Sequence, residues 1–315
     1  MAWRWSSATM GEVGVSAMPH GLPGAVTVVG LGLMGGSVVK SLRRAHPEVP
    51  VYGIEPDPGS AGLAAGDGVR IVDSLDRCPL AGGVVLFATP LDTTVALVGE
   101  TAAEWSTAAL ATDVASLKAP VLDAAAAQGP WAGGTFVGAH PMTGSERSGY
   151  AAARADLFDG ADVWITPCGP VGADRDSGAA KAVGDANADA VRRASAFWRV
   201  LGARPRVVGA EEHDRVMTWA SHLPQLVASA LAGTLADAGI PRAALGPGGR
   251  DATRIAGSNP GMWTPLLRAA AAADARALAT LEDRIGAIRG MLERGDMEGV
   301  AQLLEQARHW CVPGD

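Results

Sequence analysis

Cysteine is scarce in this chain of 315 residues and never stands in a metal-binding pattern. The three cysteines, Cys78, Cys168 and Cys311, are odd in number and widely separated, which favours a reducing compartment over a disulfide framework. The sequence has no C-x-x-C pair and no cluster of His and Cys, so we expect no bound metal. These features predict a cytoplasmic protein.

Long apolar runs and an excess of basic residues are also missing. No uninterrupted apolar run reaches the ~18 residues of a membrane-spanning helix, because charges or glycines break every candidate. The net charge of −7 argues against a surface that neutralises phosphates, so we expect neither a membrane nor nucleic acid as a partner, although a small anion stays possible. Residues 1–24 contain no apolar stretch of signal-peptide length and are interpreted as a loose leader. An overlong translation start would look the same.

What is present is a globular composition, 48% hydrophobic and 19% charged, in a chain long enough for two domains. Residues 25–30 (AVTVVG) are typical of a strand buried on both faces, and residues 30–35 (GLGLMG) give the G-x-G-x-x-G spacing ahead of a predicted helix. In such a motif Gly30 permits a tight turn, Gly32 lets a pyrophosphate approach the backbone, and Gly35 allows close helix–strand packing. The N–H groups of the helix N-terminus then face the phosphates.

The second predicted strand, residues 49–54, ends at Glu55, 23 positions after Gly32. At about this spacing a carboxylate accepts the ribose hydroxyls of NAD, whereas the 2′-phosphate of NADP would be repelled. Residues 56–58 bring no arginine that could reverse the preference. The sequence therefore favours NAD as the cofactor, although a solvated strand end would give the same pattern. The predicted cofactor-binding residues are Gly30, Gly32, Leu33, Met34, Gly35, Glu55, Thr89 and Pro90.

Buried-strand patterns recur along the first half of the chain and alternate with helical segments. This alternation predicts a doubly wound α/β nucleotide-binding domain over residues 25–168. Residues 169–188, rich in Gly, Ala and Asp, predict a flexible connection. Helical spacing dominates residues 189–311 and predicts an all-α second domain. The helix expected at 211–235 is apolar on several faces, which favours a homodimer through the C-terminal helices.

The stretch at residues 138–149 (GAHPMTGSERSG) concentrates an imidazole, hydroxyl groups and an ion pair between glycines and a proline. It follows a predicted strand at 134–137, so His140 should lie just past the carboxyl end of that strand. Ligands collect at this edge in open α/β sheets. A surface turn with an incidental histidine is the alternative.

This stretch, with AARADLFDGA from Ala152, closely resembles the active-site segment of the prephenate and arogenate dehydrogenases, the family that makes the aromatic ring of tyrosine. The resemblance extends, in family order, over GLGLMGGS at Gly30, FATP at Phe87, TDVASLK at Thr112, SHLP at Ser221 and RDATRIAGSNPGMW at Arg250. It implies a Rossmann-type domain, a helical substrate and dimerisation domain, and NAD-dependent oxidative decarboxylation of a cyclohexadienyl substrate.

The resemblance also implies roles for individual residues. His140 would accept the proton of the substrate's C4 hydroxyl, and Ser116 would lie beside the nicotinamide, although Ser116 could instead cap the following helix. Arg254 would bind a substrate carboxylate, with a local ion-pair network around Arg250 and Asp251 as the alternative. The predicted catalytic residues are thus His140 and Ser116, and the predicted substrate-binding residues are Arg254, Glu146, His222, Gln225, Trp263 and Arg250.

Two further histidines, His213 and His222, lie on one predicted helix. Nine residues separate them, so they would point about 180° apart on a regular helix and could not both face one site. His222, just before Pro224, is assigned to the cleft, and His213, next to Asp214, is assigned a structural role.

The sequence departs from the family pattern at three positions, which leaves the substrate open. Gln225 replaces a second histidine, Gly249 replaces an aromatic residue, and Asn259 replaces an aspartate. Prephenate, arogenate and 4-amino-4-deoxyprephenate all remain candidates.

Two other classes of protein compete with this interpretation. The β-hydroxyacid dehydrogenases rely on a lysine in a substrate-domain helix, and none of the three lysines, Lys40, Lys118 and Lys181, is expected there. A non-catalytic NAD sensor is the other alternative. The joint presence of His140, Ser116 and Arg254 argues against it.

Overall fold

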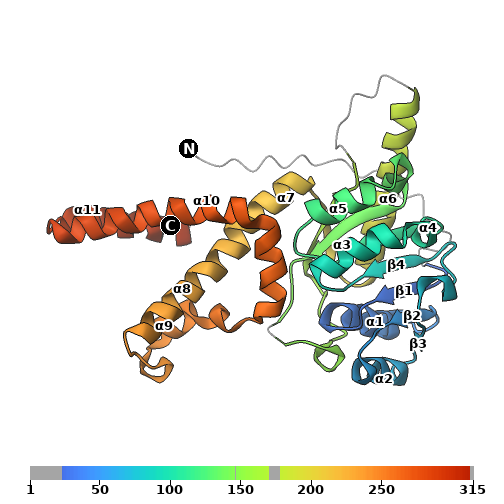
Figure 1. The fold of residues 1–315 in the computed structure, drawn as a ribbon, viewed down its shortest axis with the longest axis horizontal. Helices are drawn as coiled ribbons and strands as arrows, with labels where there is room; N and C mark the ends of the chain where they lie inside the picture. Colours follow the sequence, from blue (N-terminus) through green and yellow to red (C-terminus); the bar gives the residue numbers. More distant parts are fainter. Residues whose placement is uncertain (1–22, 146, 170–177, 313–315) are drawn as a thin grey trace. The chain divides into compact units, whose positions relative to one another are not determined.

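Eight strands of the described residues form one sheet in the order β3-β2-β1-β4-β5-β6-β7-β8, of which Figure 1 labels β1 to β4. The computed structural model describes residues 23–145, 147–169 and 178–312, so most of the predicted leader, Glu146 and part of the predicted connection lie outside the described residues. All neighbouring strands pair in parallel except β6 and β7. The strands are β1 (Val26–Val29), β2 (Val51–Ile54), β3 (Arg70–Ile71), β4 (Val84–Phe87), β5 (Leu110–Asp113), β6 (Phe136–Pro141), β7 (Asp162–Pro167) and β8 (Arg204–Val207).

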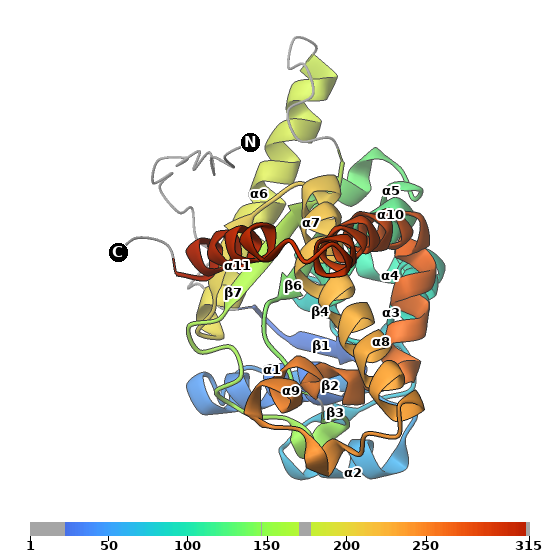
Figure 2. The ribbon, with the colours of Figure 1, turned by 90° about the vertical axis from the view of Figure 1, so that its left-hand side faces the viewer.

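Helices cover both faces of this sheet, which explains why the central strands are apolar along their whole length. In β4, Val84 and Leu86 belong to the buried cluster that contains side chains of α1 and α6, whereas Val85 and Phe87 alternate to the opposite face and are equally buried. Figure 2 shows α6 on one side of the sheet and α3 to α5 on the other. The helices are α1 (Leu33–Ala45), α2 (Pro58–Gly66), α3 (Leu91–Glu100), α4 (Ala102–Trp105), α5 (Ala119–Ala126) and α6 (Gly178–Val200).

The chain divides into two compact units, an N-terminal unit Met1–Asp214 and a C-terminal unit Arg215–Asp315. The sequence placed the second domain at residue 189, but the structure assigns α6 and β8 to the N-terminal unit. The reason is that β8 pairs with β7 and α6 packs against strands β5 to β8. The predicted connection at 169–188 is also partly helical, because α6 begins at Gly178.

Two strands differ from the prediction. Strand β3 consists of two exposed residues, too short and too polar to leave an apolar pattern. Strand β6 runs on to Pro141 and includes His140, because its antiparallel partner β7 continues the pairing to Trp164 and Val163. His140 is therefore part of the strand, one residue before its end, and does not follow it.

The C-terminal unit is helical, as predicted. Helix α7 (Ala210–Met217) reaches it from the N-terminal unit and continues through a π-helical turn, Thr218–His222, into α8 (Leu223–Asp237). The π turn precedes Pro224, which has no N–H to donate to the carbonyl four residues earlier. The remaining helices are α9 (Pro247–Ala252), α10 (Pro260–Glu293) and α11 (Met297–Cys311). Within the described residues, every helix is too short or too polar to span a bilayer.

Candidate active site

The glycine-rich loop connects β1 to α1 with the geometry that its spacing predicts. Gly30 has a φ of +93°, and a Cβ there would lie 2.7 Å from the carbonyl oxygen of Ala88. A Cβ at Gly35 would lie 2.0 Å from the carbonyl oxygen of Gly30, so only glycine allows α1 to pack this closely on β1. A Cβ at Gly32 would meet nothing within 4 Å. The loop thus has two closely packed glycines and one that faces open space.

Glu55 follows β2 and contacts this loop. Its Oε2 accepts the backbone N–H of Leu31 at 2.7 Å, and its Oε1 accepts that of Asp57 at 2.9 Å. The carboxylate is therefore held beside the glycine-rich turn and does not simply extend into solvent. After β4, the Thr89 hydroxyl pairs with that of Thr94 on α3 at 2.8 Å, and Pro90 forms the N-cap of α3.

Because β1, β4, β5 and β6 are parallel neighbours, their carboxyl ends lie along one edge of the sheet. The residues that follow these strands share that edge with His140, which lies near the end of β6. They include the glycine-rich loop, Thr89 and Ser116. The topology therefore brings the predicted cofactor loop, the serine and the histidine to the same side of the N-terminal unit.

A buried ion pair supports the backbone next to His140. Lys118 is fully buried, and its Nζ donates to Asp113 Oδ2 and, at 2.7 Å, to the carbonyl oxygen of Ala139. Asp113 Oδ1 accepts the N–H of Ala139 at 3.1 Å. Burial lowers the pKa of the Lys118 ammonium, and the neighbouring carboxylate of Asp113 opposes that shift. Both polar groups of Ala139 are thereby fixed, and with them the position of the next residue, His140.

His140 is half-buried and hydrogen-bonded to a second histidine. Its Nδ1 lies 2.9 Å from Nε2 of His213, and the two rings are tilted by 65°. His213 is fully buried, and its Nδ1 lies 2.7 Å from Asp214 Oδ1. Trp164 of β7 packs against the His213 ring with a centroid separation of 5.4 Å. The structure thus joins His140 to His213, for which the sequence favoured a structural role.

Asp214 caps helix α5. Its Oδ1 accepts the backbone N–H of Lys118 and its Oδ2 that of Ala119, each at 2.8 Å. The cap therefore comes from a residue 95 or more positions away, and Ser116 is not the cap of this helix. Ser116 is half-buried in the turn between β5 and α5, and its hydroxyl makes no hydrogen bond to another described residue.

In the C-terminal unit, Arg254 lies on a short 3₁₀ turn, Arg254–Gly257, and its side chain is exposed. It lines a cavity of about 520 Å³ whose other walls are mostly apolar, with Arg242 as a second cation. Arg250 reaches the carbonyl oxygen of Ala243 at 3.4 Å. Among the described residues Arg254 forms no ion pair with Asp251 or any other carboxylate, so the local network considered from the sequence is not formed here.

Three of the other predicted substrate-binding residues lie in helices of the C-terminal unit. His222 is fully buried, its Nδ1 lies 3.0 Å from Asp274 Oδ1, and Trp263 packs edge-on at 5.9 Å between ring centroids. Gln225 is buried and donates to the Ser229 hydroxyl at 3.3 Å. Asp274 was not singled out from the sequence. It stands on α10, 52 positions from His222.

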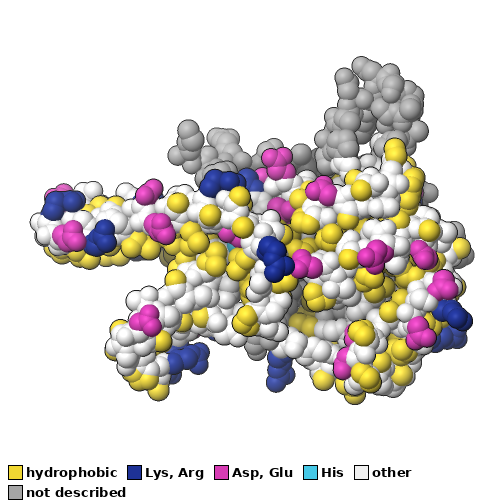
Figure 3. Space-filling view, in the orientation of Figure 1, with side chains coloured by type: hydrophobic (Ala, Val, Ile, Leu, Met, Phe, Trp, Pro, Cys, Tyr) yellow, Lys and Arg dark blue, Asp and Glu magenta, His cyan; other side chains and the backbone are white. Residues whose placement is uncertain are grey.

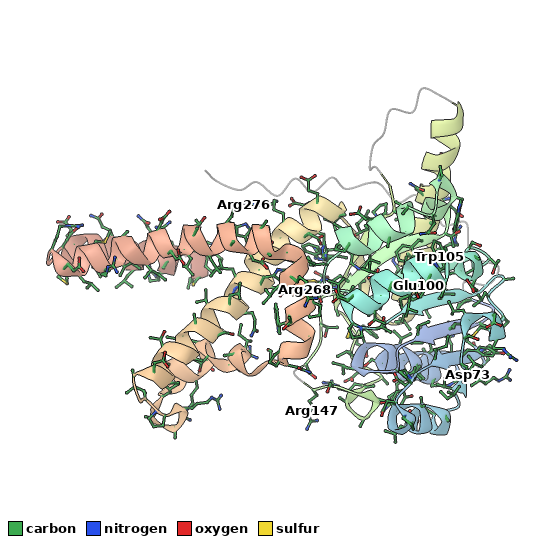
Figure 4. All side chains as sticks on the ribbon, in the orientation of Figure 1. Asp73, Glu100, Trp105, Arg147, Arg268 and Arg276 are labelled. Atoms are coloured by element: carbon green, nitrogen blue, oxygen red, sulfur yellow. The ribbon has the colours of Figure 1, made fainter. Side chains whose placement is uncertain are left out.

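The loop after β6 accounts for the last of the predicted residues. Glu146 lies outside the described residues. Its neighbour Arg147 is exposed and projects away from the ribbon (Figure 4), and its backbone N–H donates to the Ser145 hydroxyl at 3.1 Å. Asn259, which departs from the family pattern, caps α10 by accepting the Gly261 N–H at 2.9 Å. An aspartate could make the same cap, so this departure has a structural role that either residue fills.

Comparison with known proteins agrees with this architecture. The model of the prephenate dehydrogenase nucleotide-binding domain matches residues 38–192, and that of the prephenate dehydrogenase dimerization domain matches residues 209–306. The chain belongs to the prephenate dehydrogenase family.

Individual members of this family align over most of the chain. The prephenate dehydrogenase of Bacillus subtilis is 33% identical over 250 residues, which cover 77% of this chain and 63% of that enzyme. The cyclohexadienyl dehydrogenase of Zymomonas mobilis is 26% identical over 252 residues, covering 77% of this chain and 79% of that enzyme. The crystal structure of prephenate dehydrogenase from A. aeolicus in complex with hydroxyphenyl propionate and NAD⁺ superposes with a TM-score of 0.76 at 26% identity, covering 90% of this chain and 96% of that one. The chain thus spans less than two thirds of the B. subtilis enzyme.

Four polar residues around His140 were not predicted from the sequence as part of the site. Lys118, Asp113, His213 and Asp214 are polar groups of the N-terminal unit that are held around His140 by contacts between distant segments. The only sequence signal for them was their type. A lysine and an aspartate inside an apolar strand-and-helix region are expensive to bury unless they are paired.

Proposed function

We propose that this protein is an NAD-dependent cyclohexadienyl dehydrogenase that oxidatively decarboxylates prephenate or arogenate, in the pathway to tyrosine. The observation that carries the proposal is the environment of His140. The ring is half-buried at the edge of the sheet that also holds the glycine-rich loop, and a second buried histidine is bonded to its Nδ1. Membership of the prephenate dehydrogenase family supports the same activity.

The N-terminal unit has the features that NAD requires. The open space at Gly32 would receive the pyrophosphate, and the N-terminal N–H groups of α1 would face it. Glu55, held against Leu31, would accept the ribose hydroxyls. When bound, NAD⁺ supplies the acceptor for the hydride that leaves C4 of the substrate. The similar structure from A. aeolicus was solved in complex with NAD⁺, which supports this assignment.

His140 is the proposed acceptor of the proton that the oxidation releases. As hydride leaves C4, the C4 hydroxyl becomes a carbonyl and must lose its proton, and a neutral imidazole can accept that proton at physiological pH. Carbon dioxide then leaves C1, the electron pair of the broken C–C bond enters the ring, and the ring becomes a phenolate, which takes a proton to give the phenol. Ser116 would lie beside the nicotinamide and the substrate hydroxyl.

Substrate carboxylates are assigned to the C-terminal unit. Arg254 is an exposed guanidinium that lines an otherwise mainly apolar cavity, a setting in which it can pair bidentately with a carboxylate. Trp263, His222, Gln225, Arg250 and Glu146 complete the proposed substrate-binding set. The A. aeolicus enzyme was crystallised with hydroxyphenyl propionate, a compound that joins a phenol to a carboxylate as the product of the proposed reaction does.

We further propose a homodimer formed through the C-terminal helices. Helices α10 and α11 expose large apolar side chains, among them Ile285 at 55%, Leu304 at 62% and Trp310 at 84% of their surface. Figure 3 shows hydrophobic side chains gathered along these two helices. Contiguous apolar surface of this kind marks an interface in a water-soluble unit, and the matching family model is that of a dimerization domain. A cytoplasmic location stays a prediction from the scattered cysteines.

A steady-state comparison of prephenate, arogenate and 4-amino-4-deoxyprephenate, each with NAD⁺ and NADP⁺, tests the proposal. We expect turnover of prephenate or arogenate with NAD⁺ and release of one CO₂ for each NADH. Turnover of the 4-amino compound alone would replace the proposed substrate. Cofactor binding without turnover of any of the three would contradict the activity and favour a sensor.

A further inference from the structure

We propose that His213 and Asp214 are positioning residues that hold His140 in the tautomer with its proton on Nδ1, so that Nε2 is the atom that receives the substrate proton. This inference rests on the proposed function of His140 and adds two residues to it. Three side chains form the series Asp214 Oδ1, His213 Nδ1 and Nε2, and His140 Nδ1, with separations of 2.7 and 2.9 Å.

The direction of these hydrogen bonds follows from Asp214. Burial opposes ionisation of this carboxyl, but hydrogen bonds from His213 and from the N–H groups of Lys118 and Ala119 outweigh that effect, and its pKa lies below the ordinary value. An ionised carboxylate can only accept hydrogen bonds. The contact at 2.7 Å therefore requires that His213 donates from Nδ1.

The second step concerns the other nitrogen of His213. Burial lowers the pKa of His213, and the hydrogen bond to Asp214 offsets this only in part, so the ring is neutral at physiological pH. A neutral ring that carries its proton on Nδ1 has a lone pair on Nε2. Because this Nε2 lies 2.9 Å from His140 Nδ1, His140 must be the donor in that contact. His140 then has its own lone pair on Nε2.

Among the described residues, the titratable groups around His213 come from several elements. They are Asp214 on its own helix, Lys118 before α5, Asp113 on β5 and His140 on β6, and the Trp164 ring on β7 packs beside them. The Lys118 ammonium is paired with Asp113, which leaves the Asp214 carboxylate as the anion bonded directly to His213. When His140 accepts a proton and becomes an imidazolium, this carboxylate stabilises the charge through the intervening ring. The arrangement serves the same purpose as the aspartate that orients a catalytic histidine in hydrolases.

Asp214→Asn is the first test because it removes the negative charge and one of the two acceptor oxygens at the start of the series. Asp214 accepts three N–H donors, those of His213, Lys118 and Ala119, and an amide offers them a single acceptor oxygen, so the hydrogen bond that fixes the His213 proton on Nδ1 is weakened or lost. His140 is then no longer held with its proton on Nδ1. We expect kcat to fall by ~10²–10⁴-fold, as for other enzymes that lose the correct tautomer or the base itself, with KM changed by less than about threefold.

His213→Gln is the conservative companion. Its carboxamide can accept from His140 with oxygen and donate to Asp214 with nitrogen, so it keeps the direction of both hydrogen bonds. We expect a smaller loss in kcat, about tenfold. The acidic limb of the pH profile should also move to lower pH, because an imidazolium at His140 loses the support of the polarisable ring. Phe197→Leu, a buried change on α6 that leaves the three side chains untouched, is the matched control and should retain kcat and the limb.

The tautomer itself can be measured without turnover. In protein labelled with ¹⁵N-histidine, two-bond nitrogen–proton correlations should show His140, assigned by its absence from His140→Asn, as the Nδ1–H form. The Nε2–H form in wild type would overturn the inference. So would an Asp214→Asn variant with wild-type kcat and an unchanged acidic limb. If the wild type turns over none of the three substrates, the proposed function fails while the tautomer measurement still decides this inference.

Discussion

Glu55 accepts the backbone N–H of Leu31 at 2.7 Å and thereby joins the end of β2 to the glycine-rich loop that follows β1. The contact fixes one carboxylate oxygen at the place where the adenosine ribose of a dinucleotide would lie. A charge in this position favours two hydroxyl groups and repels a phosphate.

The first prediction is therefore a preference for NAD⁺ over NADP⁺ of at least ~10-fold in kcat/KM, equivalent to ~1.4 kcal/mol. Combining Glu55→Ser with Pro56→Arg should reduce the preference, because it removes the repulsion and adds a partner for the 2′-phosphate. Steady-state kinetics with both cofactors measures this. Equal efficiency of the wild type with NADP⁺ would contradict the role of Glu55.

Two glycines of the same loop should respond in opposite ways to alanine. In Gly35→Ala the new Cβ would lie 2.0 Å from the Gly30 carbonyl oxygen, so we expect the free energy of unfolding to drop by ~1–3 kcal/mol. In Gly32→Ala the Cβ meets nothing within 4 Å and φ is −78°, so stability should stay within ~0.5 kcal/mol of wild type. NAD⁺ should nevertheless bind Gly32→Ala ~10-fold or more weakly, because the methyl group occupies the space of the pyrophosphate. Denaturant unfolding and cofactor titration separate the two effects, and tight NAD⁺ binding by Gly32→Ala would place the cofactor elsewhere.

Arg254→Ala should chiefly raise KM for the cyclohexadienyl substrate. A carboxylate is present in both the ground state and the transition state, so its partner contributes uniform binding, and kcat should change little. The Kd for NAD⁺ should be that of wild type. Arg77→Ala, an exposed arginine on the N-terminal unit, is the control. A KM within about twofold of wild type would remove Arg254 from the substrate site.

Sedimentation tests the proposed dimer. We expect wild type to sediment with twice the chain mass of 32.0 kDa, and the double variant Ile285→Asp with Leu304→Asp to shift toward one chain mass, because two charges would be buried in the interface. Leu63→Asp is the control, since Leu63 is similarly exposed at 53% but lies on α2 of the N-terminal unit. A monomeric wild type at micromolar concentration would contradict the assignment.

The sequence predicted those parts of the structure that depend on local patterns. The glycine spacing identified the turn at Gly30 and the close packing at Gly35, and the acidic residue after the second strand was found again beside the loop. Continuous apolar runs located the central strands because these strands are buried on both faces. The short strand β3 and the extension of β6 to His140 were not predicted, since the first has no apolar pattern and the second depends on its partner strand.

Contacts between distant segments could not be predicted in the same way. The helix angle between His213 and His222 predicted that the two would not face one site, but it gave no indication of what His213 contacts. His213 belongs to the N-terminal unit, where it meets a residue 73 positions away. The cap of α5 was assigned to the nearby Ser116 as one possibility, whereas the structure uses Asp214. In both cases the sequence could suggest only hydrogen-bond partners nearby in the chain, whereas the folded structure brings in a partner from a distant segment.

The measurement that tests the central claim most directly is the pH dependence of kcat for wild type and His140→Asn with prephenate, which has no amine of its own to titrate. If His140 accepts the proton, the wild-type rate falls as pH drops through the pKa of the imidazole in the complex, because only the neutral ring can act as a base. His140→Asn should lose ~10²–10⁴-fold in kcat, keep KM nearly unchanged and lack the acidic limb. An acidic limb that persists unchanged in His140→Asn, or a kcat within about threefold of wild type, would contradict the account and assign the role of proton acceptor to another group.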